Sequence, residues 1–223
     1  MIRSETLFEE YCRGVDILAE KIPTRPTQTP DYILAFGQYR LLSEVKEIEQ
    51  NSYEKALFAL PFEQWGENEC VYYGGAPGAR LRKKIAAASR QLKAYDEQEL
   101  PTLLVIWNSI RPYPDICDDS AISTAMFGIE TALISSQAAP EGGATILKRW
   151  HGGDRQCTPR CNTSLSAVGI LDTDKDLTNL RIYHNPFARV SLSPVQFSPP
   201  RCTHKQVASD PQKSFVAWNN IVP

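Results

Sequence analysis

Residues 30–46 read "PDYILAFGQYRLLSEVK", and this stretch decides the fold. Two runs rich in apolar and aromatic residues are separated by Gly-Gln, a dipeptide suited to a tight turn. We therefore predict a β-hairpin over residues 31–48. Three charged residues stand at one end of this hairpin: Asp31 opens the first strand, and Glu44 and Lys46 lie near the end of the second.

The hairpin predicts that these three side chains meet, because the start of one strand lies beside the end of its partner. Glu44 and Lys46 are two residues apart and share a face of the strand. Two neighbouring carboxylates favour Mg²⁺ or Mn²⁺, since Mg²⁺ is often held by one or two carboxylates together with water and a substrate phosphate. A lysine beside such a metal can orient or deprotonate a water molecule and offset phosphate charge. The pattern predicts phosphodiester hydrolysis; the alternative is a surface salt bridge at a strand end.

The composition is that of a packed globular protein. The chain has 223 residues, of which 42% are hydrophobic and 22% charged, and its net charge is −2. Any surface that binds nucleic acid must therefore be local. No apolar run approaches the roughly 18 residues of a membrane span, and the opening "MIRSETLFEEYC" lacks an apolar signal core. We expect a cytoplasmic protein that does not enter a membrane, with its six cysteines reduced.

Around the hairpin, the periodicity of apolar residues predicts further helices and strands. Helices are expected over 4–22, 78–99 and 121–136, and strands over 102–109, 164–171, 179–184 and 214–219. The segment "PTRPTQTP" (23–30) is a linker that could hold an edge strand. This order predicts a single α/β domain over residues 1–223. Its core would span 4–108, with a strand-rich extension over 109–223 packed on it.

Pro-Asp, twelve residues and then Glu-Val-Lys resembles the signature of the PD-(D/E)xK nuclease superfamily, which includes restriction enzymes, Holliday junction resolvases and RecB-type nucleases. In that fold a helix precedes the hairpin, and a second helix and a strand follow it, as expected here over residues 4–108. The resemblance implies a restriction-endonuclease-like core with a mixed central sheet flanked by helices. It also implies a metal-dependent nuclease, with DNA as the expected substrate and RNA left open.

The resemblance adds two residues to the site formed by Asp31, Glu44 and Lys46. Many family members carry a glutamate on the first helix that helps to hold the metal. Glu5 is favoured here because it borders the apolar stripe, with Glu9 second and Glu10 further from the stripe. The segment "QLKAY" (91–95) also resembles the Q-x-x-x-Y pattern of RecB-like nucleases, in which the glutamine lies by the active site. That pattern implies a role for Gln91.

Basic residues crowd the start of the 78–99 helix, after a glycine-rich loop. They are Arg80, Arg82, Lys83 and Lys84. Positive charge at a helix N-terminus opposes the helix dipole, so helix stability does not explain it. We expect these residues to contact nucleic-acid phosphates; the alternative is a solvated charged face.

The C-terminal half offers other chemistry. Its candidate zinc ligands are His151, Cys157, Cys161, Cys202 and His204, in a spacing that matches no recognised zinc finger, so we expect ordinary thiols. Ser164 and His184 could suggest a hydrolase, but no G-x-S-x-G and no orienting acid accompany them.

A second class of function stays open, namely a non-catalytic binding or assembly protein on a nuclease-like scaffold. The acidic net charge slightly favours it. The intact Asp31, Glu44 and Lys46 favour a nuclease.

Overall fold

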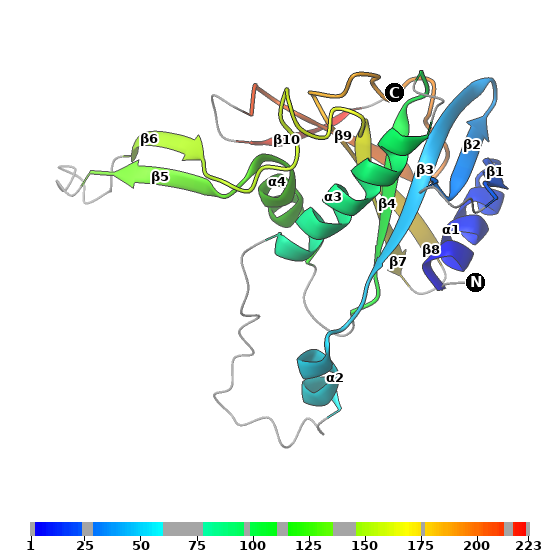
Figure 1. The fold of residues 1–223 in the computed structure, drawn as a ribbon, viewed down its shortest axis with the longest axis horizontal. Coiled ribbons are helices and arrows are strands. Elements are labelled where there is room, and N and C mark those ends of the chain that lie inside the picture. Colours follow the sequence, from blue (N-terminus) through cyan, green and yellow to red (C-terminus); the bar gives the residue numbers. More distant parts are fainter. Residues whose placement is uncertain are drawn as a thin grey trace.

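The computed structural model describes residues 3–23, 29–59, 78–95, 99–110, 116–135, 146–174, 177–211 and 216–221. Its centre is an eight-stranded sheet (Figure 1). The strands, in their order across the sheet, are β1 (Leu18–Lys21), β2 (Tyr32–Phe36), β3 (Tyr39–Ile48), β4 (Thr102–Asn108), β7 (Ala167–Asp174), β8 (Leu177–His184), β9 (Cys202–Val207) and β10 (Trp218–Ile221). A separate two-stranded sheet joins β5 (Glu130–Ile134) to β6 (Ile146–His151). The helices are α1 (Arg3–Gly14), α2 (Ser52–Phe58), α3 (Ala79–Ala94) and α4 (Asp119–Phe127).

The large sheet is mixed. The first three strands are antiparallel, β3, β4 and β7 run parallel, β8 is antiparallel to β7, and β9 is parallel to β8. Strands from the second half of the chain therefore continue the sheet that the first half begins. The prediction of an α/β fold with a mixed central sheet flanked by helices is confirmed.

Each face of the sheet has its own apolar core. One face packs beneath α3 and α4, and the other packs against α1. Successive residues of β4 alternate between the two cores, and six of its seven residues are buried. This explains why its sequence, "TLLVIWN", is apolar almost throughout.

The first helix is shorter than predicted. Asp16 has a positive φ of 56°, and the carbonyl of Cys12 accepts hydrogen bonds from the backbone N–H groups of Val15 and Ile17. The chain turns there, and residues 18–21 form β1, which pairs with β2. The predicted helix over 4–22 is therefore wrong after Gly14. The suggested edge strand in 23–30 falls largely on residues 24–28, which lie outside the described part.

The helix predicted over 121–136 is also wrong in its second half. The Asp118 carboxylate caps α4 by accepting a hydrogen bond from Ala121 N (2.7 Å), and the helix ends at Phe127. Gly128 has a φ of 96°, and a Cβ there would lie 2.9 Å from the carbonyl oxygens of Gly152 and Gly153. The chain leaves this glycine as the extended strand β5.

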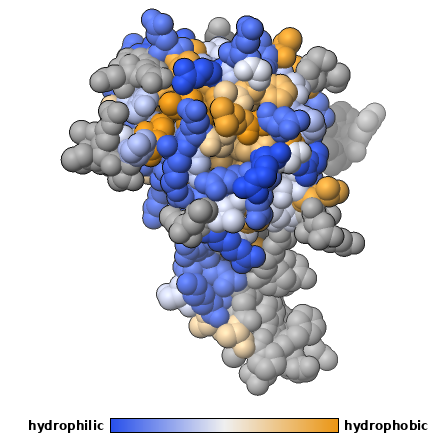
Figure 2. All heavy atoms as spheres, turned by 90° about the vertical axis from the view of Figure 1, so that its right-hand side faces the viewer, coloured by the Kyte–Doolittle hydropathy of each residue, from blue (hydrophilic) through white to orange (hydrophobic). Residues whose placement is uncertain are grey.

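The predicted hairpin, the helix over 78–99 and the strands β4, β7 and β8 are confirmed, with shifted ends. The predicted strand over 214–219 overlaps β10, whereas α2, β6 and β9 were not predicted. Within the described ranges, no helix is long and apolar enough to cross a membrane. Viewed from the β1 side, hydrophilic residues surround a smaller apolar area in the upper part of the molecule (Figure 2).

Candidate active site

The β2–β3 hairpin brings Asp31 and Glu44 to the same end of the sheet. Tyr32, the first residue of β2, pairs with Ser43 in the antiparallel register, and Asp31 directly precedes it. The Asp31 N–H donates to the Ser43 carbonyl (3.1 Å), and Asp31 Oδ2 accepts a hydrogen bond from Val45 N (2.8 Å). The charge of Asp31 contributes to raising the pKa of Glu44, so the two carboxylates lie near each other at one end of the hairpin.

Lys46 joins them on the same face of the sheet. Its Nζ forms an ion pair with Glu44 Oε1. Leu42 and Ile48, which alternate with this pair along β3, belong to the core beneath α3 and α4, so Glu44 and Lys46 face those helices. The Glu44 side chain is fully buried, whereas a quarter of the Lys46 side chain (25%) is exposed. Solvent therefore reaches the Lys46 side chain in this pair.

The Glu44 carboxylate lies in an environment that disfavours its charge. Burial raises its pKa to about 7, and the negative charge of Asp31 adds to the rise, although Lys46 and Gln91 act in the opposite direction. Despite the ion pair with Lys46, neither carboxylate oxygen accepts a hydrogen bond of ordinary geometry from the described residues. A buried carboxylate without such donors is costly to ionise. Glu44 therefore has capacity for a further positive partner.

Asp31 is in a related state. Burial raises its pKa, and the charge of Glu5 raises it further, whereas the Val45 N–H, Lys46 and Lys21 lower it. The pKa values of both carboxyl groups are thus raised, and Lys46 lowers both in part.

Helix α3 brings Gln91 to this pair. The Gln91 amide lies close enough to Glu44 to lower the pKa of the carboxylate, although the contact does not reach the geometry of an ordinary hydrogen bond. Tyr95, four residues later, is partly buried against the core beneath α3. The structure therefore places the amide of the Q-x-x-x-Y segment beside the carboxylate of Glu-Val-Lys.

The three glutamates of α1 have different surroundings. Glu5 pairs with Lys21 Nζ (2.5 Å), and its charge reaches Asp31. Glu9 accepts a hydrogen bond from the Tyr32 hydroxyl (2.8 Å), and Glu10 is exposed. Glu5 therefore lies at the border of the site, although a lysine already neutralises it.

Sequence analysis did not identify Lys21 as a residue near the site. The pKa of Lys21 is raised, chiefly by its hydrogen bond to Glu5, with further contributions from Glu9 and Asp31. Predicting residues 18–21 as a strand would have identified Lys21, since Lys21 pairs with Tyr32, which is next to Asp31. Treating residues 18–21 as helix concealed this proximity.

In the ranges that the structure covers, no three His, Cys, Asp or Glu side chains gather closely enough to form a metal centre by themselves. Asp31 and Glu44 nevertheless fit a site of the kind Mg²⁺ uses, in which one or two carboxylates are completed by water and substrate phosphate. The buried oxygens of Glu44, which Lys46 and Gln91 compensate only in part, are the observation that supports this fit.

The four predicted phosphate-binding residues differ in exposure. Arg80 forms an ion pair with Glu54 (2.6 Å), and Arg82 is 8% exposed and makes contacts of its own. Lys83 is exposed and Lys84 is half-buried. Arg90 and Lys93, which sequence analysis did not single out, are also exposed on α3. The seven-residue spacing from Lys83 to Arg90 could have identified them, because it places both on one side of a helix.

The C-terminal candidates fall into separate sets of contacts. His151 Nδ1 lies 3.2 Å from the Gly128 carbonyl oxygen, and Cys157 neighbours Cys161 across a turn. His204 uses Nδ1 toward His184 (2.9 Å) and Nε2 toward Cys202 (3.6 Å). These contacts use the two different nitrogens of the His204 ring. A metal bound to one of these nitrogens would therefore have either Cys202 or His184 on its side of the ring, but not both.

Ser164, the candidate nucleophile of a hydrolase, contacts a serine of α3. Its Oγ lies 3.1 Å from Ser89 Oγ, whereas the His184 ring contacts His204. The structure therefore does not pair Ser164 with the histidine that a hydrolase would need.

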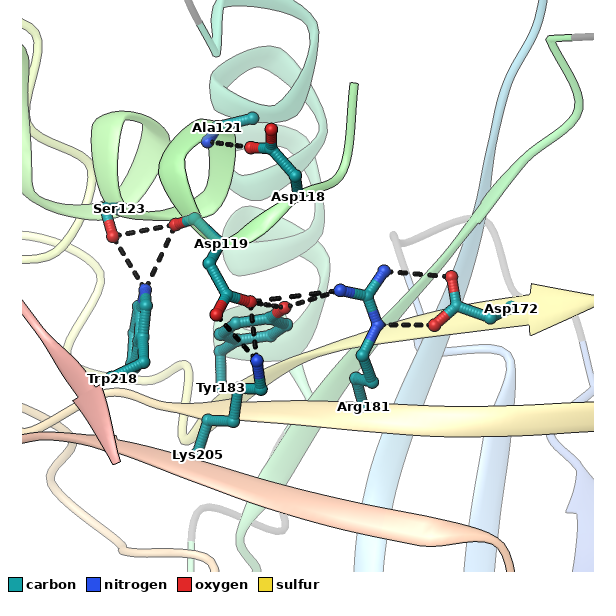
Figure 3. A network of polar contacts seen from close by, with 9 residues as sticks. All are labelled: Asp118, Asp119, Ala121, Ser123, Asp172, Arg181, Tyr183, Lys205 and Trp218. Carbon is teal, nitrogen blue, oxygen red and sulfur yellow. Dashed lines mark hydrogen bonds and ion pairs between the residues drawn. The ribbon is translucent and has the colours of Figure 1, made fainter. Parts of the chain in front are cut away.

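A second polar cluster on the same sheet face joins α4 to β7, β8 and β9 (Figure 3). Lys205 Nζ donates to both Asp119 oxygens (2.7 Å each), the Tyr183 hydroxyl donates to Asp119 Oδ1 (2.6 Å), and Arg181 forms two hydrogen bonds with Asp172 (2.5 and 3.0 Å). Burial raises the pKa of Asp119, but its bonds from Lys205 and Tyr183 outweigh burial and lower the pKa overall. Because each charge has an opposite partner, this Asp119 network is suited to fastening α4 to the sheet.

The network is separate from the Asp31–Glu44–Lys46 site. Glu44 pairs with Leu104, Leu104 with Val168 and Val168 with Tyr183, so two apolar residues stand between Glu44 and Tyr183 in one row of the sheet.

Comparison of the chain with protein-family models, curated proteins and solved structures finds no match. A functional assignment therefore depends on the geometry of the site.

Proposed function

We propose that this protein is a divalent-metal-dependent nuclease of the PD-(D/E)xK type that hydrolyses phosphodiester bonds in DNA. The observation that carries this proposal is the cluster of Asp31, Glu44 and Lys46 at one end of a hairpin, with Gln91 beside it. A buried acid pair with a partly accessible lysine has little structural purpose, because two apolar residues would fill the same space without the cost of desolvation.

The order of elements also supports the proposal. Helix α1 precedes three antiparallel strands, and α3 leads from β3 to the parallel strand β4. This is the arrangement that a restriction-endonuclease-like core would have, with the site on β2 and β3. The C-terminal strands would then be an extension of that core's sheet.

Asp31 and Glu44 would hold one Mg²⁺ or Mn²⁺, and Glu5 would contribute from α1 if its pair with Lys21 opens. The cation supplies positive charge that stabilises the phosphate in the transition state. Its presence would also offset the cost of ionising Glu44, whose pKa is raised to about 7 by burial. Gln91, beside the same carboxylate, would keep Glu44 oriented.

Lys46 would serve the attacking water. In hydrolysis the water oxygen forms a bond to phosphorus while the ester P–O bond breaks; the water gives up one proton to solvent, and the leaving oxygen takes up one proton from solvent. The Lys46 ammonium, held by Glu44 and a quarter exposed, is placed to orient that water and to offset the developing negative charge.

Helix α3 offers a surface for the phosphate backbone. Its sixteen residues contain no Asp or Glu, and Lys83, Arg90 and Lys93 are exposed along it. Lys83 and Arg90 are about 10 Å apart along the helix axis. In a chain of net charge −2, this local basic face beside Gln91 favours nucleic acid as the substrate.

The test is a cleavage assay on single-stranded, duplex and branched DNA, with RNA in parallel, in Mg²⁺, in Mn²⁺ and in chelator. Wild type should cut with metal alone. Lys46→Ala should lose about 10²–10⁴ in rate, the usual effect of one acid–base or orienting group, and should retain its fold and substrate affinity. Lys55→Ala, at an exposed lysine of α2, is the matched control.

Two results would count against the proposal. Equal rates for Lys46→Ala and wild type would remove the lysine from the mechanism. A wild-type protein that cuts no substrate with either metal, yet binds a protein partner, would support the non-catalytic scaffold instead.

A further inference from the structure

The β5–β6 hairpin projects from the body of the molecule as an arm (Figure 1). It forms a two-stranded sheet of its own, joined to the rest at its base through Gly128 and Gly152. Six of the nine large hydrophobic side chains that are exposed in the described part of the chain lie on this arm or at its root. They are Ile129, Leu133, Ile134, Ile146, Leu147 and Trp150.

Such an arm is not expected to be stable alone in water. An isolated two-stranded hairpin is marginal, and three or more strands with a buried face are needed for independent stability. Clustered exposed apolar residues also mark interaction sites. A further strand paired with the arm would supply the third strand that such stability requires.

The free edge of β5 is where that strand would pair. Residues 131–134 read Thr-Ala-Leu-Ile and carry no charge. The other sheet edges have the usual protection against edge pairing: β1 and β10 are four residues long, β1 exposes Glu20 and Lys21, and β6 exposes Lys148. β5 is five residues long and carries one charged residue, Glu130, at its base, so its edge is uncharged over residues 131–134.

We propose that the partner is a second copy of this chain, paired antiparallel through β5 across a two-fold axis. Each arm would then supply two strands of a four-stranded sheet. A two-fold axis brings the same edge of both copies together, so both free edges are satisfied at once. Pairing through β5 sets the uncharged segment 131–134 against itself, whereas pairing through β6 would bring two copies of Lys148 together. This inference does not depend on the proposed nuclease function.

The first test is the mass of the full-length protein in solution, by light scattering and sedimentation over a range of concentrations. Wild type should be a dimer. Leu133→Lys, on β5, should raise the dimer dissociation constant at least tenfold. Leu147→Lys, on β6, is the matched control because both leucines are about half exposed (50% and 61%), and it should stay dimeric.

The second test is chemical and does not need a destabilising charge. Cys161 is exposed and is first replaced by serine. In that background Ala132→Cys or Leu133→Cys should form an intermolecular disulfide under mild oxidation, because opposed residues of an antiparallel pair near the axis face their own copies. Leu147→Cys should not.

Circular dichroism identifies any variant that fails to fold, and the cysteine variants then decide. A wild-type monomer at all concentrations would overturn the proposal. So would a dimer that survives Leu133→Lys and shows no crosslink through β5, because its interface would lie elsewhere.

Discussion

Glu44 is a carboxylate in surroundings that disfavour its negative charge. Its side chain is fully buried, its pKa is raised to about 7 by burial and by Asp31, and one lysine and one amide partly compensate. In the folded protein without metal, the ionised form is therefore disfavoured relative to the unfolded chain. A group of this kind is expected where a ligand of opposite charge binds.

Glu44→Gln should stabilise the metal-free protein at pH 8. The folded pKa of about 7 exceeds the ordinary 4.5, so stability falls as pH rises between these values and the cost is fully present above pH 7. By linkage, the gain at pH 8 is about 3 kcal/mol and disappears below pH 4.5. Urea unfolding in chelator at both pH values measures it.

Glu47→Gln, one strand position from Lys46 and on the opposite face, is the control for removal of one carboxylate from β3. An equal or lower stability of Glu44→Gln at pH 8 would show that Glu44 is already well compensated without metal. Added Mn²⁺ should raise the melting temperature of wild type and leave that of Glu44→Gln almost unchanged.

The candidate site could be predicted where neighbouring sequence positions determine the geometry. The alternation along a strand places Glu44 and Lys46 together, and a two-residue turn brings Asp31 to the same end of the hairpin. Lys21 could not be predicted in this way. Its position depends on the pairing of β1 with β2, which the sequence pattern of residues 18–21 does not reveal.

At the scale of elements, two predicted helices proved to be a helix followed by a strand. In both segments the apolar spacing suits either structure. Asp16 and Gly128, both with positive φ, end the helices, and the strands that follow are specified by partners, β2 and β6. Strand β9 was missed because its sequence, "CTHKQV", is polar and joins the sheet through pairing with β8.

Helix α3 permits a prediction about binding. Arg90→Ala and Lys93→Ala should each weaken binding of duplex DNA and reduce the slope of log affinity against log salt by about one unit, as for one lost phosphate contact. Both residues are exposed and outside the cleavage site, so the rate at saturating DNA should not change. Titrations at several salt concentrations measure this.

Arg13→Ala, at an exposed arginine of α1, is the control for loss of one positive charge. Unchanged slopes for the α3 variants would remove this helix from the binding surface. Arg82→Ala is unsuitable for this comparison, since Arg82 is buried and its loss would act on stability.

At the scale of the whole molecule, one sheet unites the two halves of the chain, and the Asp119 network fastens α4 across its C-terminal strands (Figure 3). Asp119→Asn should lower the free energy of unfolding by about 1 kcal/mol at pH 7, a charge-assisted bond reduced by partial exposure. Since the folded pKa is lowered, this contribution is present above the ordinary value of 3.8 and is lost as pH falls below it.

Unfolding curves at pH 7 and pH 2.5 test this, with Asp154→Asn at an exposed position as the control. Because two apolar residues separate the network from Glu44, cleavage by folded Asp119→Asn should equal that of wild type. A selective loss of cleavage without loss of stability would instead place Asp119 in the chemistry.

The central claim is that Asp31 and Glu44 share one divalent cation. A crystal structure with Mn²⁺, analysed by anomalous scattering, tests it most directly. The account predicts one peak with an oxygen of Asp31 and an oxygen of Glu44 each at about 2.0–2.2 Å, and no peak in Glu44→Gln. The claim would be contradicted if, at saturating Mn²⁺, both side chains were ordered and no anomalous peak lay between them, or if the metal were bound elsewhere.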